Sequence, residues 1–357
     1  MNRAQKKPKT EKVEVKEKSL KERLTGPILS KYGDLVLPTT ITGTLETGWL
    51  AFDYFAPIEL GNSLLIYGAS QSGKSLIMMK LGAAAQDKGG LFVCFNTEAA
   101  NRDRTHLEKV VPNLKYDDIV FYQPESIEAT IECIHMLVDN FDKDCQVPLF
   151  VSIDSISSCA TKRELEAEEF KGKDMSGMEI ASIWSRALRQ LTSKMSKKRI
   201  VLCLVSQMRT GGIGSFVTKN VSGGGWAPGF YASTTLLTSG KAFLYQSKPG
   251  DPYVAKPVFD MQGKAAQECS MYLEKSRYSS GGAKLSYTIH FDTGISPYSG
   301  LIDLLEYKGI VEKSGAWYSY KEHNLGCGKK NVEQFFVENP SVIEEIKKEL
   351  YKPVVLK

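Results

Sequence analysis

Residues 68–75 have the spacing G-x-x-x-x-G-K-S, which is typical of loops that bind phosphate groups. Gly68 and Gly73 let the backbone turn tightly and come close to phosphate oxygens. Lys74 can reach the β- and γ-phosphates, and the hydroxyl of Ser75 can hold Mg²⁺. Backbone N–H groups between the two glycines can also face the phosphates, and they belong to Ala69, Ser70, Gln71 and Ser72. The pattern therefore predicts a polyphosphate site with Mg²⁺.

Two acidic side chains follow apolar runs that predict buried strands. Asp154 comes after residues 148–153 and matches the Walker B pattern, in which a carboxylate at a strand end accepts from Mg²⁺-bound water. Glu98 follows residues 91–96. Ligands of open parallel sheets bind beyond the carboxyl ends of the strands, so Glu98 could orient and deprotonate an attacking water. Taken alone, Glu98 could as easily cap the following helix.

Gln207 ends a third apolar run, residues 200–207, where an amide can donate to a γ-phosphate and also hold the next loop. That loop, residues 208–225, is rich in glycine and contains Arg209 and Phe216. A glycine-rich loop of this length is usually functional or disordered. Positive charge, an aromatic ring and a flexible backbone suit single-stranded nucleic acid, although composition alone indicates this only weakly.

The elements that must position these residues alternate between strand and helix. The apolar run before the phosphate loop and the three runs above predict buried parallel strands, because they do not alternate with polar residues. Helical spacing is found at 76–85, 127–141 and 179–194, and the charged segment 161–178 predicts a mobile loop. Further strands are expected at 234–237, 242–245, 271–274 and 285–291. The pattern predicts an α/β fold with a mostly parallel sheet flanked by helices.

The end of the chain predicts a small α+β unit of its own. Its expected elements are helices at 301–308, 332–337 and 341–351 and a strand at 317–320.

Composition bounds the class of protein. The chain has 357 residues, of which 42% are hydrophobic, and a formal net charge of +5. No apolar run approaches the length of a membrane span and the start lacks a signal-peptide core, so we expect a cytoplasmic protein without membrane contact. Seven cysteines without a C-x-x-C pair indicate reduced thiols. Residues 1–24 carry nine Lys or Arg against four Glu, which fits a solvated tail or a binding arm for nucleic acid or a partner.

The order of these motifs resembles the RecA family of recombinases, including its phage UvsX branch. The resemblance covers roughly residues 26–350. Its most specific stretches, besides the phosphate loop, are 96–100, 206–209, 229–233, 274–277 and 310–320. It implies a basic N-terminal arm with a polymerisation helix at 1–35, a RecA-like ATPase core at 36–296 with DNA-binding loops at 161–178 and 208–225, and a C-terminal α+β domain at 297–357.

The resemblance also implies roles for single residues. Glu98 matches the general base and Gln207 the γ-phosphate sensor, while Lys275 and Arg277 match the pair that reaches the nucleotide of a neighbouring protomer. Phe230 matches an aromatic of the protomer interface. The implied DNA contacts are Arg189, Arg209, Gly211, Gly212, Phe216, Gly224 and Gly225.

The base of the nucleotide is the one part of the site where the sequence departs from the family. The aromatic that stacks on adenine is replaced by Thr105, with His106 beside it, so we include His106 among the nucleotide contacts. Phe291 matches a residue beside the base.

The resemblance implies a DNA-dependent ATPase with ATP and Mg²⁺ that forms helical filaments of its own copies on single-stranded DNA and exchanges strands with double-stranded DNA. Loader or single-strand-binding proteins are further expected partners. The alternatives are a non-filamentous RecA-like ATPase that regulates or loads a partner, and a hexameric helicase with the same core.

Overall fold

The computed structural model describes Ser30 and residues 43–98, 103–166, 177–212, 218–222, 225–245, 264–279 and 281–351. The chain divides into Met1–Thr40 and Ile41–Lys357, and the fold below is that of the second unit. The predicted arm at 1–35, apart from Ser30, therefore lies outside the described residues, as do Phe216, Gly224 and the middle of segment 161–178.

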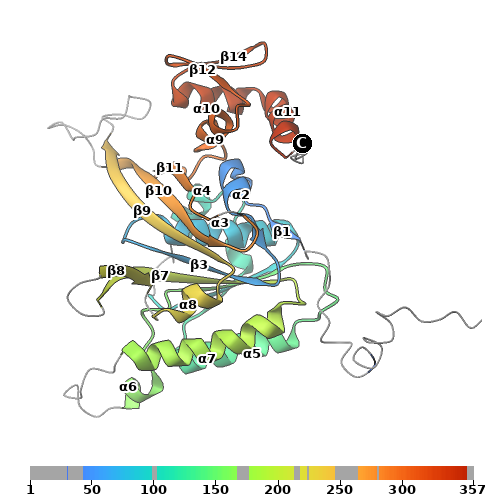
Figure 1. Ribbon diagram of the computed structural model, residues 1–357. Coiled ribbons are helices and arrows are strands. Elements are labelled where there is room, and N and C mark those ends of the chain that lie inside the picture. The colour runs from blue at the N-terminus through green and yellow to red at the C-terminus, as the bar shows by residue number, and fades with distance from the viewer. Residues whose placement is uncertain are drawn as a thin grey trace, which may run out of the picture. The chain divides into compact units, whose positions relative to one another are not determined.

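A nine-stranded sheet forms the centre of the fold (Figure 1). Its strands, in spatial order, are β11 (Lys284–His290), β10 (Lys264–Ser276), β9 (Thr234–Tyr245), β3 (Asn62–Gly68), β7 (Ile200–Gly212), β6 (Leu149–Asp154), β4 (Leu91–Asn96) and β5 (Ile119–Tyr122). The strands from β9 to β5 are parallel, whereas β10 pairs antiparallel with both β9 and β11. The ninth strand, β8 (Thr218–Ser222), pairs antiparallel with the end of β7.

Helices cover both faces of this sheet (Figure 1). One face carries α2 (Leu50–Phe55), α3 (Lys74–Asp87) and α4 (Arg104–Val110), and the other carries α5 (Ile127–Asn140), α7 (Gly177–Met195) and α8 (Ala227–Tyr231). The short helix α6 (Lys162–Glu166) lies beyond α7 on that side. Small elements complete the core: a two-stranded sheet of β1 (Thr44–Leu45) and β2 (Ile58–Glu59), and the 3₁₀ turn η2 (Tyr116–Asp118).

Strand β3 shows why the apolar runs of this sequence do not alternate. Its residues Leu64 and Ile66 pack in one core cluster with α3, whereas Leu65 and Tyr67 pack in a second cluster with α5 and α7. Because both faces of the strand are covered by helices, positions 64–67 are all buried and are apolar or aromatic. This packing fixes the strand that leads into the phosphate loop.

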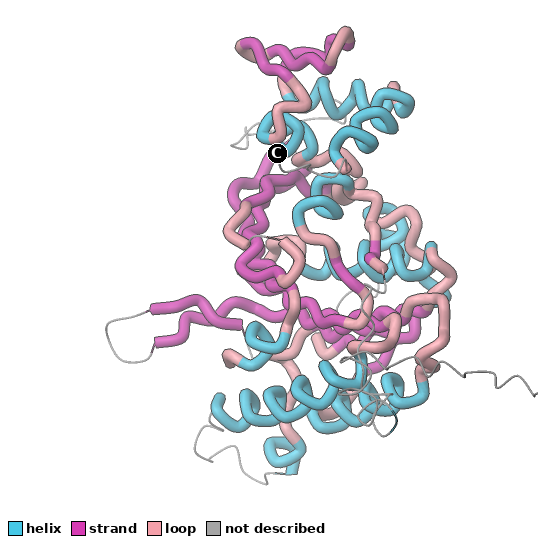
Figure 2. Tube along the Cα trace, turned by 45° about the vertical axis from the view of Figure 1, so that its right-hand side comes forward, coloured by secondary structure: helices cyan, strands magenta, loops and turns pink. Residues whose placement is uncertain are grey.

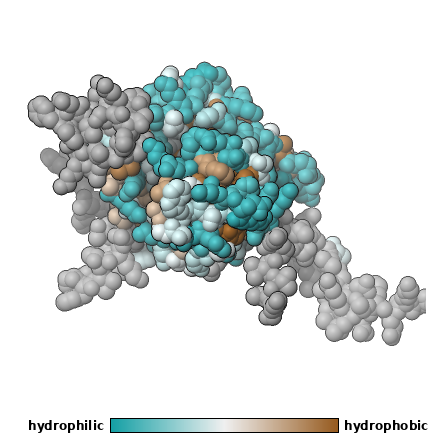
Figure 3. Space-filling model, turned by 90° about the horizontal axis from the view of Figure 1, so that it is seen from above, coloured by the Kyte–Doolittle hydropathy of each residue, from teal (hydrophilic) through white to brown (hydrophobic). Residues whose placement is uncertain are grey.

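The C-terminal unit contains two elements more than the sequence predicts. Its elements are α9 (Leu301–Tyr307), β12 (Glu312–Ser314), β13 (Trp317–Tyr320), β14 (His323–Cys327), α10 (Lys329–Glu338) and α11 (Pro340–Leu350). The three strands form a sheet in the order β12-β13-β14. Seen from above, the face that carries this unit is mostly hydrophilic with small hydrophobic patches (Figure 3).

Three predicted segments differ from the structure. The segment expected as a loop at 208–225 contains a hairpin, in which Met208 pairs with Ser222 and Gly212 with Thr218, and Figure 2 shows it projecting from the sheet. The two strands expected at 234–237 and 242–245 are one strand, since β9 absorbs an extra residue as a bulge after Gly240 and continues. Part of the loop expected at 161–178 is the helix α6.

All seven cysteines are free thiols, and four of them are buried. Within the part of the chain that the structure describes, no helix combines the length and the apolar character needed to cross a membrane.

Candidate active site

The phosphate loop connects the end of β3 to the start of α3, as its sequence pattern requires. Gly73 precedes the helix with φ +84°, in the left-handed region that favours glycine. A Cβ atom at Gly73 would lie 2.5 Å from Cδ1 of Ile289, and one at Gly68 would overlap the carbonyl oxygen of Thr238. The two glycines are therefore needed both for the turn and for the close packing of β9 and β11 against the loop.

Side chains of the neighbouring strands β9 and β11 support the conformation of this loop through hydrogen bonds. The buried hydroxyl of Ser72 donates to the carbonyl of Ala69 at 2.7 Å and lies 2.7 Å from the Thr238 hydroxyl. The Tyr287 hydroxyl donates to the carbonyl of Ser72 at 3.1 Å. A loop supported in this way keeps a cradle for phosphate groups without having to fold around them.

Lys74 bends back onto the loop that precedes it. Its Nζ donates to the carbonyl oxygens of Ala69 at 2.7 Å and Gly68 at 3.2 Å. Burial lowers the pKa of Lys74, and the nearby carboxylates of Asp154 and Glu98 act in the opposite direction. A buried ammonium whose described hydrogen bonds go to backbone carbonyls, and not to a carboxylate, is suited to meet an anionic group.

Ser75 and Asp154, the two residues expected to hold a divalent cation, lie in contact. The Ser75 hydroxyl donates to Oδ2 of Asp154 at 2.6 Å, and Asp154 is 4% exposed. A hydroxyl and a carboxylate are hard oxygen ligands of the kind that Mg²⁺ prefers, together with water and phosphate oxygens. The donor set fits the expected metal.

Glu98 is fixed by hydrogen bonds at the edge of the sheet next to Asp154. Its Oε1 accepts from the hydroxyls of Ser155 at 2.6 Å and Ser158 at 2.9 Å, and from the Gln207 amide at 3.2 Å. Helix α4 is capped instead by Asp103, whose side chain accepts from the His106 N–H at 3.1 Å. The helix cap that the sequence could have assigned to Glu98 is therefore Asp103. Glu98 remains a candidate general base.

Ser155 and Ser158 had no recognised role in the sequence. Ser155 follows Asp154 directly, and Ser158 is three residues farther on. Ser155 is itself held by Thr97, whose Oγ1 accepts from the Ser155 N–H at 2.7 Å and donates to its carbonyl at 2.8 Å. A run of hydroxyl residues after a Walker B aspartate was the available signal, but only the parallel register of β4 and β6 shows which carboxylate they reach.

A cavity of about 630 Å³ opens beside the phosphate loop. His106 and Phe291, both expected near the nucleotide, line this cavity together with the loop. Thr105, which the structure also describes, is exposed and does not line it. The lining residues are Gln71, Ser72, Gly73, Lys74, Ser75, Leu76, His106, Phe243, Lys264, Gln267, Ile289 and Phe291. The sequence did not predict Phe243, Lys264 and Gln267 at this site, because the pairing of β9, β10 and β11 is what brings them to the cavity.

The described residues among those expected at DNA lie on α7, at the end of β7 and just after β8. Arg189 is exposed on α7, and Arg209, Gly211 and Gly212 lie at the hairpin end of β7. Gly225 has φ +79° and packs against α7, where an added Cβ would lie 2.8 Å from that of Ala181. Gly225, which follows the hairpin, thus lies against α7.

Phe230, Lys275 and Arg277 gather away from the phosphate loop. Phe230 on α8 is 71% exposed. The Lys275 Nζ donates to the carbonyls of Gly229 at 3.0 Å and Phe230 at 2.6 Å and lies 5.9 Å from the centre of the Phe230 ring. Arg277 is exposed just past the end of β10.

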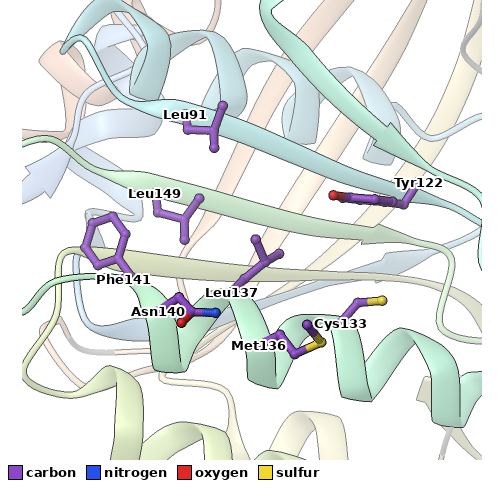
Figure 4. Close-up of a pocket in the computed structure, with 8 residues that line it drawn as sticks. All are labelled: Leu91, Tyr122, Cys133, Met136, Leu137, Asn140, Phe141 and Leu149. Carbon is purple, nitrogen blue, oxygen red and sulfur yellow. The ribbon is translucent and has the colours of Figure 1, made fainter.

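A second cavity, of about 390 Å³, lies at the β5 edge of the sheet (Figure 4). The side chains in Figure 4 come from α5, from Phe141 just after it and from strands β4, β5 and β6, and they are mostly apolar. Met136 and Tyr122 are 58% and 43% exposed there. The lining residues are Leu91, Tyr122, Cys133, Met136, Leu137, Asn140, Phe141 and Leu149, and we call them the edge groove.

Comparison with known proteins shows which family the chain belongs to. Residues 37–247 match the RecA N-terminal domain, and residues 299–354 match the RecA C-terminal domain. Protein RecA of Geobacter sulfurreducens is 30% identical over 329 residues, covering 91% of this chain and 89% of the relative. Protein RecA of Geobacter metallireducens is 29% identical over 330 residues, covering 92% of this chain and 89% of the relative.

Among solved structures, the crystal structure of the RadB recombinase is similar at 19% identity, with a TM-score of 0.47, over 70% of this chain and 98% of that one. We draw no functional conclusion from this distant likeness. The two domain matches and the RecA relatives are sufficient by themselves: the chain belongs to the RecA family of recombinases and ATPases, with a RecA-like core and a small C-terminal domain.

Proposed function

We propose that this protein is a DNA-dependent ATPase that forms filaments on single-stranded DNA and exchanges strands with double-stranded DNA. The observation that carries the proposal is the 3.2 Å hydrogen bond from the Gln207 amide to Glu98. It joins the candidate base to strand β7, which continues directly into the hairpin where DNA contacts are expected. A movement of the Gln207 side chain can therefore shift the part of β7 that forms the hairpin.

The roles in hydrolysis follow from the contacts of each side chain. Lys74 leaves the carbonyls of Gly68 and Ala69 to neutralise charge on the β- and γ-phosphates of ATP. Ser75 and Asp154 hold Mg²⁺, which supplies further charge neutralisation when bound. Glu98 is anchored through Oε1, so its other oxygen, Oε2, takes the proton from the attacking water. The Gln207 amide has two hydrogens, and the one that donates to Glu98 in the structure is the one that we propose to move to the γ-phosphate.

Exchange of that amide hydrogen bond would couple ATP to DNA. With ATP bound, Gln207 turns from Glu98 to the γ-phosphate, and the hairpin that begins at Met208 moves with it. Arg209 and Arg189 then bind DNA phosphates, and Phe216 separates groups of bases. The glycines of the hairpin let its backbone follow the strand of DNA.

Lys275 and Arg277 act on the nucleotide of a neighbouring protomer. Lys275 pairs with Thr235, which pairs with Leu65, three residues before Gly68 on β3. At about 3.3 Å per residue this is roughly 10 Å along the strand, with two strand spacings to cross in addition. Arg277 is farther still, since its N–H donates to the carbonyl of Ser233, beside the start of β3. The pair therefore lies well away from the phosphate loop of its own chain.

Two apolar surfaces support assembly of copies of this chain. Phe230 is the most exposed aromatic beside Lys275, and the edge groove leaves Met136 and Tyr122 open at the side of the sheet. Exposed apolar patches of this kind mark interaction sites in many proteins. In the proposed filament, a neighbouring copy covers both surfaces.

Electron microscopy of the full chain with single-stranded DNA and a slowly hydrolysed ATP analogue tests this proposal. Helical filaments are the expected result. Rings would favour a hexameric helicase, and neither form would favour a RecA-like ATPase that loads or regulates a partner. Loader and single-strand-binding proteins, and a place in the cytoplasm, belong to the same proposal.

A further inference from the structure

Three side chains form a row across the antiparallel strands beside the phosphate loop. Phe243 of β9 pairs with Gln267 of β10, and Gln267 pairs with Ile289 of β11. Residues that pair directly across strands point to the same face of a sheet. Ile289 presses against Gly73, so this face is the one that the phosphate loop rests on.

Phe243 stands at the far end of the row from the loop. The apex of the loop lies over Gly240, where a Cβ would come within 3.7 Å of the Gln71 carbonyl. Phe243 is three residues farther along β9, but Lys241 between them is the bulge residue, so the advance matches two residues of β10, about 7 Å at strand spacing. The cavity therefore has a polar end at Lys74 and Ser75 and an aromatic end at Phe243.

Two contacts set the position of the Phe243 ring. The Nζ of Lys264 lies 3.6 Å from the centre of the ring, an arrangement that attracts the cation to the π face. The ring of Phe291 lies 6.4 Å away, centre to centre, at an angle of 42°. The half-buried Phe243 ring is thus held from one side by Lys264 and stands beside Phe291 at the same end of the cavity.

We propose that Phe243 is the platform on which the base of the bound nucleotide stacks, with Phe291 beside the base. Thr105 offers no ring to the cavity, whereas Phe243 brings one from a different element. The inference rests on the proposed function in that it needs ATP at the phosphate loop. Because every base has a π face, Phe243 supplies affinity for nucleotides over phosphate chains without a base, more than a choice between bases.

The test compares two ligands with Mg²⁺ by titration calorimetry on the full chain: ATP and inorganic tripolyphosphate, which has no base. Phe243→Ala is expected to raise the Kd of ATP about 5- to 150-fold, the range that corresponds to loss of one base–aromatic stack. The Kd of tripolyphosphate should stay as in the unsubstituted protein. Phe243→Tyr should bind ATP normally, and Phe243→Leu, which keeps the bulk and loses the π face, should bind it weakly.

Leu244→Ala is the matched control, since the neighbouring residue on β9 points to the opposite face of the strand. It should leave both Kd values unchanged. If Phe243→Ala binds ATP as the unsubstituted protein does, or if it weakens ATP and tripolyphosphate equally, the platform role is overturned while the proposed function stands. If the unsubstituted protein binds tripolyphosphate and ATP equally well, the platform role also falls. Failure of the unsubstituted protein to bind ATP at all overturns both proposals.

Discussion

Glu98 receives all three of its described side-chain hydrogen bonds on one oxygen. Ser155, Ser158 and Gln207 each donate to Oε1. Such a carboxylate is fixed in direction while Oε2 is kept for chemistry, as a general base requires. A helix cap would accept from backbone N–H groups, whereas Glu98 accepts from three side chains.

Glu98→Gln should separate catalysis from binding. The amide oxygen of Gln can still accept from Ser155 and Ser158, so the side chain keeps its place, but it cannot take a proton from water. We expect ATP hydrolysis with single-stranded DNA to fall by about 10²-fold or more. The Kd of ATP should change less than about twofold. Phosphate release and calorimetry measure the two effects.

Ser158→Ala serves as the comparison for Glu98→Gln. It removes one of three donors to Oε1 and leaves the carboxylate, so its loss of activity should be the smaller one. Hydrolysis by Glu98→Gln at the unsubstituted rate would show that another group accepts the proton.

Residues of the phosphate loop were predictable because their chemistry is local in sequence. Lys74, Ser75 and the two glycines lie within eight positions, and one strand and one helix place them. Ser155 and Phe243 were not predictable, since their partners Glu98 and Phe291 are distant in sequence. Which side chains face one another there depends on the pairing register of the strands, and that register is set by tertiary packing.

Helices and strands were also predictable where their cause is local in the sequence, and not where it is a distant partner. Long apolar runs were placed correctly as β4, β6 and the first part of β7, because burial on both faces leaves no choice of residue type. The short strand β5 and the polar strand β8 have no such run and were missed. Strand β8 exists because its backbone pairs with β7, which composition does not reveal.

His290, at the end of strand β11, is expected to make the stability of the fold depend on pH. Burial lowers the pKa of His290 below its ordinary value of 6.5; Asp292 opposes this shift and Lys330 of α10 adds to it. The folded protein thus favours the neutral ring, so the unfolded chain binds more protons as the pH falls below 6.5. We expect the free energy of unfolding to fall between pH 7.5 and pH 5.5.

His290→Gln should reduce that fall, since the substituted side chain does not titrate. Urea unfolding of both proteins at the two pH values measures the difference, with nucleotide and DNA absent so that binding does not contribute. An identical loss of stability in the two proteins on acidification would show that other groups cause it.

At the scale of the whole molecule, the groups proposed to act in hydrolysis lie at two separate places. Lys74 and Glu98 lie by the phosphate loop, whereas Lys275 and Arg277 lie beside α8 and the start of β9. Head-to-tail assembly brings such a pair of places together at every interface and, where the rotation does not close, continues into a helical filament. An active site shared between protomers would make ATP hydrolysis depend on assembly.

Mixing two inactive variants tests this sharing. Lys74→Ala has no cation at its own phosphates but intact Lys275 and Arg277, whereas Lys275→Ala/Arg277→Ala has an intact pocket and no cations to lend. Each alone with single-stranded DNA should lose about 10³-fold in hydrolysis, the scale of cations that stabilise phosphoryl transfer. In an equal mixture about one quarter of the interfaces join an intact pocket to intact cations, so about a quarter of normal activity should return.

Co-assembly must be established in the same samples, by energy transfer between labels on the two variants. The triple variant Lys74→Ala/Lys275→Ala/Arg277→Ala, mixed with Lys74→Ala, is the control, because no interface in that mixture contains an intact pocket. Mixed filaments that recover no hydrolysis at any ratio would place Lys275 and Arg277 outside the neighbouring site. Activity that returns without co-assembly would mean that one variant retains hydrolysis of its own, because cations lent between protomers can act only across an interface.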